Sequence, residues 1–210
     1  MSHTPSRHSV LIGLALAGLL PVACNQSNTL DQFESEMKSG LITDGIAHAT
    51  LLDANGAEVA RVRFASHTVG SQVQISAIGL TTGIHAFHVH ANNDPTNGDG
   101  CIAPTFASAD GHYNPAGLSH PNHAGDMPVV FFSTGVSSFL GSPTFGYANF
   151  ITSNFTPDEV KGKAIILHQL ADNCANIPTR YSAAGVPGPD ATTLSTGDAG
   201  GRQACGVITD

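Results

Sequence analysis

The chain has 210 residues, of which 41% are hydrophobic and only 11% are charged, and its formal net charge is -8. This length suits one globular domain with a core of its own, and the negative charge argues against a protein that binds nucleic acid or an anionic membrane surface. The 23 Gly and 12 Pro residues indicate many turns and favour an all-β fold. The 11 His outnumber the 8 Lys and Arg, which points to metal binding because His is the commonest metal ligand.

The first 24 residues have the pattern of an export signal. Arg7 supplies a positive start, residues 10–20 (VLIGLALAGLL) are apolar but too few to span a bilayer, and residues 20–24 (LPVAC) resemble a bacterial lipoprotein cleavage box. We therefore expect a signal peptide over 1–23 and a lipid on Cys24; an ordinary secretory signal or an uncleaved anchor would also fit. Export to the periplasm or cell envelope would place the protein where disulfides persist.

Polar residues 24–40 are expected to form a flexible tether, and residues 41–210 to form the domain. Within the domain, residues 58–65 (EVARVRFA) alternate between apolar and polar, as a half-buried strand does. Asn55-Gly56 before them predicts a hairpin turn, because such turns need positive φ. By the same criteria, strands are predicted at 45–52, 58–65, 72–80, 84–90, 129–132, 147–152 and 163–168, and residues 202–209 close the chain.

Two long stretches without clear periodicity, residues 91–126 and 171–201, interrupt the predicted strands. Loops of this length inside a compact domain are usually functional. Short strands separated by turns, together with two long loops, predict an antiparallel sandwich or barrel.

His88 and His90 stand two residues apart on a predicted strand, so both rings lie on the same face. Taken alone, the pair is better explained as two polar residues on an exposed face. His168 ends a later apolar strand, where a ligand would be held rigidly, although a lone histidine at a strand end is more often structural.

His112, His120, His123 and Asp126 fall within fifteen residues of the first long loop. Three imidazoles and a carboxylate form a complete tetrahedral ligand set of the kind that zinc accepts. A solvated His-rich loop is the alternative explanation of this spacing.

Five motifs then occur in an order that closely resembles the copper–zinc superoxide dismutase family. They are 83–90 (GIHAFHVH), 111–115 (GHYNP), 123–126 (HAGD), 167–172 (LHQLAD) and 201–208 (GRQACGVI). The resemblance covers about residues 45–209. It implies an all-β antiparallel Greek-key sandwich or barrel, and an exported bacterial enzyme that dismutes superoxide to oxygen and hydrogen peroxide.

The resemblance also implies two metal sites that share His112. The copper ligands would be His88, His90, His112 and His168, and the zinc ligands would be His112, His120, His123 and Asp126. Four imidazoles suit Cu(II), whereas zinc has no redox chemistry and would be the structural partner. The shared ring of His112 would also carry a proton during turnover.

Further roles follow from the same resemblance. Arg202 would orient the superoxide anion, Asp172 would hydrogen-bond one copper and one zinc histidine, and Cys101 would form a disulfide with Cys205. Cys174 has no counterpart, and we expect a buried thiol, with intermolecular pairing as the alternative. The second loop lacks the Lys/Glu pattern with which eukaryotic members steer their substrate.

The main alternative function is a non-catalytic copper- and zinc-binding envelope protein on the same fold. Such a relative would be expected to lack a copper ligand or the guiding arginine, and all of these are present here. A zinc hydrolase is disfavoured because it needs an open position on the zinc.

Overall fold

A computed structural model of the chain describes residues 47–134 and 144–210, apart from residues 99, 179 and 184. The predicted signal peptide, Cys24, the tether and the first residues of the domain lie outside these ranges, so they stay predictions. Within the described ranges, no helix is long and apolar enough to cross a membrane.

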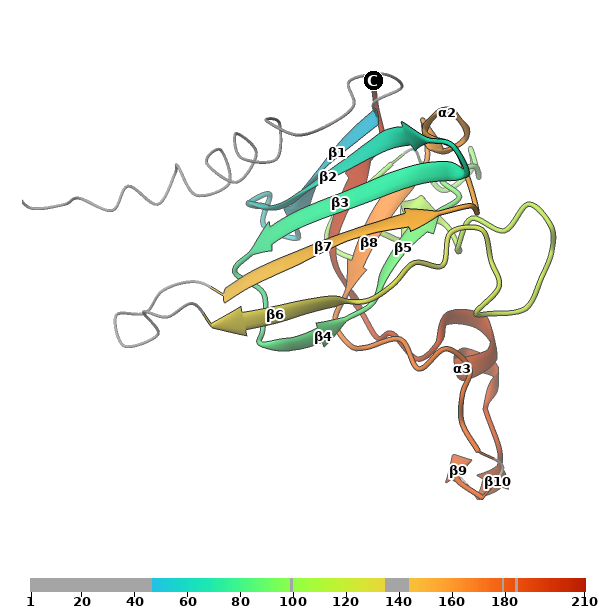
Figure 1. Cartoon of the computed structure of the whole chain (residues 1–210). Helices are drawn as coiled ribbons and strands as arrows, with labels where there is room; N and C mark the ends of the chain where they lie inside the picture. Colours follow the sequence, from blue (N-terminus) through green and yellow to red (C-terminus); the bar gives the residue numbers. More distant parts are fainter. Residues whose placement is uncertain (1–46, 99, 135–143, 179, 184) are drawn as a thin grey trace, which may run out of the picture.

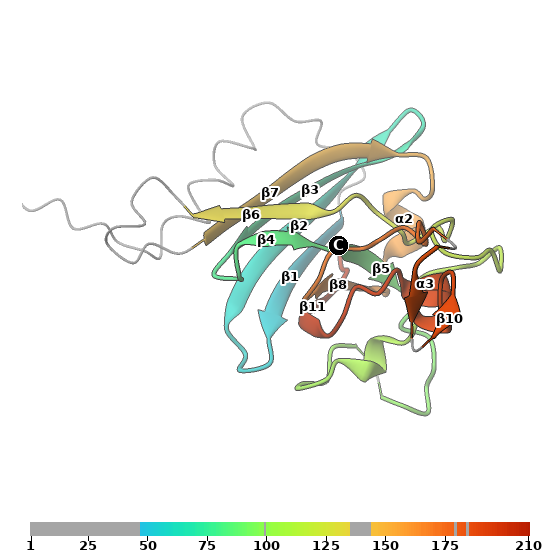
Figure 2. The same ribbon diagram turned by 90° about the horizontal axis from the view of Figure 1, so that it is seen from below.

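Nine strands form one antiparallel sheet that nearly closes into a barrel (Figures 1 and 2). They are β1 (Ala47–Asp53), β2 (Glu58–His67), β3 (Gly70–Ile78), β4 (Gly83–His85), β5 (Phe87–His90), β6 (Val130–Thr134), β7 (Thr144–Thr152), β8 (Ala164–His168) and β11 (Arg202–Val207). Their order in the sheet is β4-β6-β7-β3-β2-β1-β11-β8-β5. Pairs such as β1 with β11 and β3 with β7 require the crossovers of a Greek key, which confirms the predicted all-β fold.

The edge strands β4 and β5 were predicted as one strand over 84–90, and the structure divides them at Ala86. His85 pairs with Val130 of β6, whereas Phe87 pairs with Leu167 of β8. The Ala86 N–H instead donates to Leu170 O at 2.8 Å. The chain therefore turns a corner of the barrel here, and both edges of the sheet come from one short segment.

Side chains along each strand alternate between the two faces of the sheet, and those that point inward fill the barrel core. Phe64, Ile75, Phe87, Phe132 and Leu167 are completely buried in it. Strand β8 is buried on both faces, because its outward residues lie in a second cluster under the first long loop. That cluster consists of Phe106, Ala109, Ala164, Ile166 and Cys205.

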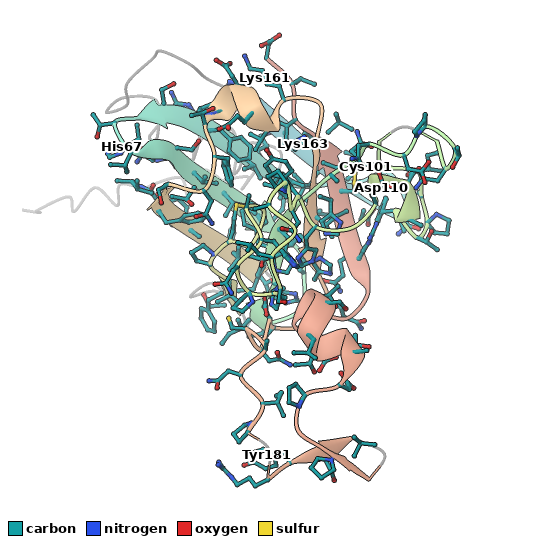
Figure 3. The ribbon with its side chains drawn as sticks, turned by 90° about the vertical axis from the view of Figure 1, so that its right-hand side faces the viewer. His67, Cys101, Asp110, Lys161, Lys163 and Tyr181 are labelled. Carbon is teal, nitrogen blue, oxygen red and sulfur yellow. A yellow bond between two sulfur atoms is a disulfide. The ribbon has the colours of Figure 1, made fainter. Side chains whose placement is uncertain are left out.

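The first long loop packs on the outside of β8 and β11, where Phe106 and Ala109 lie in one cluster with Ala164, Ile166 and Cys205. The first loop contains the short helix η1 (Ala107–Ala109) and is joined to β11 by the disulfide Cys101–Cys205, as the resemblance implies (Figure 3). The second loop contains α3 (Ala191–Thr196) and a projecting hairpin of β9 (Ser182–Ala183) and β10 (Val186–Pro187) (Figure 1).

Helix α2 (Pro157–Val160) was not predicted, although its start carries a recognisable signal. Thr156 and Glu159 form a capping box, and Pro157 occupies the first turn. One turn is too short to show helical periodicity, so only this cap could have revealed it.

Candidate metal centre

Strands β5 and β8 carry three histidines on the outer face of the barrel. Along β5, Phe87 and Val89 point into the core, so His88 and His90 point outward. His168 ends β8 on the same outer side, and its ring centroid lies 5.0 Å from that of His88 and 5.5 Å from that of His90.

The first loop runs alongside β5 and brings its own ligands to the same place. Tyr113 N–H donates to Val89 O at 2.8 Å, and Val89 N–H donates to Gly125 O at 2.9 Å. A Cβ at Gly125 would lie 2.2 Å from Val89 O, so only glycine allows this approach. His112 and Asp126, which flank these contacts, are thereby placed beside His90 and His88.

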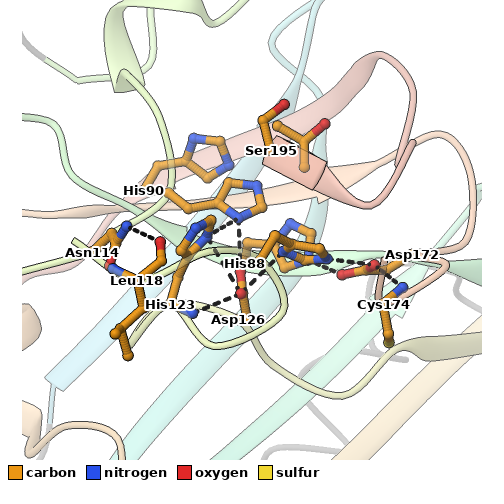
Figure 4. A network of polar contacts seen from close by, with 12 residues as sticks. His88, His90, Asn114, Leu118, His123, Asp126, Asp172, Cys174 and Ser195 are labelled. Carbon is orange, nitrogen blue, oxygen red and sulfur yellow. Dashed lines mark hydrogen bonds and ion pairs between the residues drawn. The ribbon is translucent and has the colours of Figure 1, made fainter. Parts of the chain in front are cut away.

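Seven predicted ligand residues converge into two sets that share His112; Figure 4 labels His88, His90, His123 and Asp126 among them. In each set the candidate ligand atoms all lie within 4.8 Å of one another. All six histidines are 8% exposed or less. The first set is His88, His90, His112 and His168, and the second is His112, His120, His123 and Asp126.

The distances between facing ligand atoms in each set suit a bound metal ion. In the first set, His90 Nε2 lies 3.4 Å from His168 Nε2. In the second, His123 Nδ1 lies 3.3 Å from both His112 Nδ1 and Asp126 Oδ2, and His120 Nδ1 lies 3.0 Å from Asp126 Oδ2. Ligands bound at zinc distances in a tetrahedron are about 3.3 Å apart.

Three buried ring nitrogens in the described part of the chain make no hydrogen bond: His88 Nδ1, His112 Nε2 and His120 Nδ1, the last of which lies 3.0 Å from Asp126 Oδ2 without hydrogen-bond geometry. Leaving such an atom unsatisfied costs about 1–3 kcal/mol. His112 Nδ1 contacts Asp126 Oδ1 at 2.7 Å, so its two nitrogens serve different sets. A metal ion in each set would satisfy all three orphaned atoms.

Asp172 joins the two sets from outside. Its Oδ2 accepts from His88 Nε2 at 2.9 Å, and its Oδ1 accepts from His120 Nε2 at 2.8 Å. Both rings therefore keep Nδ1 free for a metal. Burial acts to raise the pKa of Asp172, but hydrogen bonds from His88, from Cys174 N–H and from His120 lower that pKa far below its usual range.

Helix α3 holds Asp172 in place through the glycine at its C-terminal cap. Gly197 has φ +64°, and a Cβ there would lie 1.8 Å from Asp172 Oδ1 and 2.7 Å from His120 Nε2. Its carbonyl accepts from Asn173 N–H at 2.9 Å. Sequence analysis missed Gly197 because its role depends on a contact between distant segments.

Arg202 begins β11, and its guanidinium lies against the first loop. Nη1 donates to Phe106 O and Nη2 donates to Asp110 O. Burial lowers the pKa of Arg202, while the negative charge of Asp110 opposes this change. A guanidinium nonetheless stays charged at any relevant pH. Arg202 therefore supplies a positive charge whose position is fixed by two carbonyls of the first loop.

The structure also places Cys174 and His85. Cys174 is exposed, so the expectation of a buried thiol is wrong; it lies in the second loop beside Asp172 rather than in a strand. His85, in the 83–90 motif, is buried, and its Nδ1 lies 2.8 Å from His168 O.

The buried histidines make the metal-free protein sensitive to acid. Burial, together with the repulsion that a second protonated ring at His88 would exert, lowers the pKa of His168 from 6.5 to about 3. Because the folded value lies below the unfolded one, stability is full above pH 6.5 and is lost as the pH falls towards 3, by on the order of 5 kcal/mol for this ring. Urea unfolding of chelator-treated protein at several pH values measures this loss. His168→Gln should flatten the slope, and a pH-independent midpoint in the parent would contradict the prediction.

Comparison with known proteins gives a consistent result. The family model described as copper/zinc superoxide dismutase (SODC) matches residues 59–208. Superoxide dismutase [Cu-Zn] of Mycobacterium bovis and that of Mycobacterium tuberculosis are each 38% identical over 176 residues, covering 76% of this chain and 68% of the relative. The Deinococcus radiodurans protein of the same name is 29% identical over 175 residues, covering 76% of this chain and 82% of the relative.

Two solved structures share the fold. A crystal structure of the clock protein EA4 has a TM-score of 0.58 at 27% identity and covers 81% of this chain and 97% of its own. Cu/Zn superoxide dismutase from Brucella abortus has a TM-score of 0.52 at 23% identity, with 77% of this chain and 98% of its own covered.

Proposed function

The chain belongs to the copper/zinc superoxide dismutase family and dismutes superoxide to oxygen and hydrogen peroxide, and we propose how its residues divide this work. Copper is held by His88, His90, His112 and His168, and zinc by His112, His120, His123 and Asp126. The observation that carries this assignment is the position of His112. Its Nδ1 contacts Asp126 of the zinc set, and its buried Nε2, on the side of the copper set, makes no hydrogen bond.

The chemistry of the donors decides which metal belongs to which set. Four imidazole rings suit Cu(II), and three imidazoles with a carboxylate suit a closed zinc site. When bound, copper supplies the one-electron chemistry, because it can be reduced by one superoxide and reoxidised by a second.

The protein's own residues bind the substrate and handle its protons. The Arg202 guanidinium offers a planar fork to the small anion, and its two backbone acceptors keep that fork in one orientation. His112 Nε2 would bind either copper or, when released from it, a proton for the nascent peroxide, whereas Nδ1 would stay on the zinc side. Asp172 keeps the His88 ring oriented throughout.

Metal analysis combined with a superoxide assay on the same purified sample tests the proposal. One copper and one zinc per chain, with fast dismutation, is the expected result. Binding of both metals without activity would favour the alternative of a non-catalytic metal-binding envelope protein. Failure to bind copper at the four histidines would overturn the assignment of the sites.

Arg202→Ala is expected to slow dismutation by about 10- to 100-fold, since a hydrogen bond to a charged group contributes about 1.5–3 kcal/mol. It should also flatten the dependence of the rate on ionic strength, because a positive charge near the substrate path is lost. Arg180→Ala is the matched control, since Arg180 is exposed and packs over the Tyr181 ring at 4.9 Å. Equal rates for the parent and Arg202→Ala would exclude a guiding role.

Asp172→Asn is expected to weaken zinc binding by about 10- to 100-fold, the usual effect of losing a hydrogen-bond partner of a ligand. An amide can accept from only one of the two rings and presents N–H to the other, so either His88 or His120 loses its orientation. Competition with a chromophoric chelator measures the affinity. Asp158→Asn, in α2, serves as control, and unchanged zinc affinity in Asp172→Asn would show that the carboxylate does not act on the site.

We further propose that the enzyme is exported and anchored to the cell envelope through a lipid on Cys24. The apolar run 10–20 and the small residue before Cys24 support this. Metabolic labelling with a fatty acid should mark the full-length chain but not Cys24→Ala; labelling of neither would leave a plain secretory signal as the explanation.

A further inference from the structure

The backbone carbonyl of Asp110 serves two functional residues at once. Its oxygen accepts from His90 Nδ1 at 2.8 Å and from Arg202 Nη2. The first bond orients a ring of the proposed copper set, with Nε2 towards His168. The second orients the guanidinium proposed to bind superoxide. The direction of this single carbonyl therefore affects the geometry of both, together with Phe106 O in the case of Arg202.

The backbone of Asp110 holds an unfavourable conformation to point its carbonyl this way. Its φ is 65° and its ψ is -158°, a region that is almost restricted to glycine. A side chain there costs about 1–3 kcal/mol unless the surroundings compensate. Because residue 110 is an aspartate and not a glycine, contacts of its side chain have to offset this conformational cost.

The Asp110 carboxylate supplies those contacts. Oδ2 accepts from Asn93 N–H at 2.6 Å and from Asp94 N–H at 2.9 Å, and Oδ1 accepts from Asn97 Nδ2 at 2.5 Å. Hydrogen bonds to a charged group contribute about 1.5–3 kcal/mol each, so two of them offset the backbone cost. Figure 3 labels Asp110 on the first loop.

The segment that the carboxylate binds is itself fixed to the barrel. Asn92 Nδ2 donates to Gly162 O at 2.7 Å, and Asn92 N–H donates to Ala109 O at 3.0 Å. The segment 92–97 directly follows β5, the strand that carries His90. The carboxylate therefore ties residue 110 to a rigid part of the fold.

We propose that the side chain of Asp110 is a positioning residue for dismutation: it locks residue 110 in its strained conformation and so aims one carbonyl at His90 and Arg202. This inference rests on the proposed roles of those two residues. Without the carboxylate, residue 110 relaxes towards negative φ, the carbonyl turns away, and His90 and Arg202 each lose a fixed acceptor.

Three substitutions separate the parts of this proposal. Asp110→Ala removes the carboxylate and keeps the unfavourable φ for a side chain. Asp110→Gly removes the carboxylate but relieves the conformational cost. Asp110→Asn keeps an oxygen that can accept from Asn93 and Asp94, and its amide N–H can donate to Asn97 once the Asn97 amide turns round to present its oxygen. Asp53→Ala is the matched control, because Asp53 Oδ1 also accepts two backbone N–H groups, in a turn away from the site.

The first measurement is hydrogen–deuterium exchange in the metal-free protein, which does not depend on activity. The amides of Asn93 and Asp94 should exchange at least about tenfold faster in Asp110→Ala, and at the parent rate in Asp110→Asn and Asp53→Ala. Unchanged exchange in Asp110→Ala would overturn the proposal whatever the enzyme does.

The second measurement uses the copper- and zinc-loaded protein with azide as an anionic probe. Asp110→Ala should bind azide about tenfold more weakly and show an altered Cu(II) electron paramagnetic resonance spectrum, Asp110→Gly should lie between, and Asp110→Asn should match the parent. Loss of stability with parent azide affinity and parent spectrum would show a merely structural residue. If the parent itself fails to bind copper, the proposed function fails, and the exchange result still decides the role of the carboxylate in the loop.

Discussion

Replacing His112 with alanine is expected to abolish dismutation and to weaken both metal sites together. The ring is 8% exposed and belongs to both ligand sets, with Nδ1 against Asp126 and Nε2 without a protein partner. Loss of a ligand should exceed the 10- to 100-fold effect that is usual for an outer hydrogen-bond partner, so we expect activity to fall by more than about 1,000-fold. Copper and zinc contents measured after dialysis, together with the superoxide assay, give the result.

A second histidine variant distinguishes a shared ligand from a general disturbance of the loop. His123→Ala removes one member of the zinc set alone, so it should lower zinc content while copper stays bound. His67→Ala, at the end of β2 and remote from the site, should change neither metal. Retention of copper and of most activity in His112→Ala would show that the two sets are independent.

Removing the disulfide between Cys101 and Cys205 is expected to lower the free energy of unfolding by about 4.7 kcal/mol. The bond joins residues separated by 104 positions, and the entropy of closing a loop of that size in the unfolded chain corresponds to this value. Domains are stable by only about 5–15 kcal/mol in total, so the loss is a large part of the whole. The bond also fastens the first loop to β11, the strand that begins with Arg202.

Urea unfolding of the metal-free double variant Cys101→Ser with Cys205→Ala measures this effect. Alanine suits position 205 because that residue is 1% exposed and packs with Phe106 and Ile166. Cys174→Ser is the matched control, since that thiol is free and exposed, and its effect should stay within about 0.5 kcal/mol. A double variant whose free energy of unfolding stays within about 1 kcal/mol of the parent would contradict the prediction. It would show that the disulfide does not stabilise the domain by restricting the unfolded chain.

Much of the fold could be predicted from local patterns. The alternation in 58–65 matches the buried and partly buried residues of β2, and the Asn55-Gly56 turn lies between β1 and β2, with Gly56 at φ 84°. The division of 84–90 at Ala86 could not, because it depends on where β6 and β8 offer hydrogen-bond partners. Helix α3 and the β9–β10 hairpin are too short to leave a periodic signal.

The candidate site, too, could be predicted only in part from local patterns. Spacing alone places His88 and His90 on one face, and it gathers His112, His120, His123 and Asp126 in one loop. Nothing local brings His168, Asp172 or Arg202 to them; only the resemblance to a family implied that step. Gly125, Gly197 and Asp110 act through close backbone approaches or a backbone conformation, and such roles become visible only when the partner segments are in place.

The most direct test of two metal ions on either side of one imidazole is a crystal structure with anomalous scattering recorded at both the copper and the zinc absorption edges. The account predicts a copper peak within bonding distance of nitrogens of His88, His90, His112 and His168, and a separate zinc peak bonded to His112, His120, His123 and Asp126. A single shared peak, or two peaks of which only one contacts His112, would contradict it.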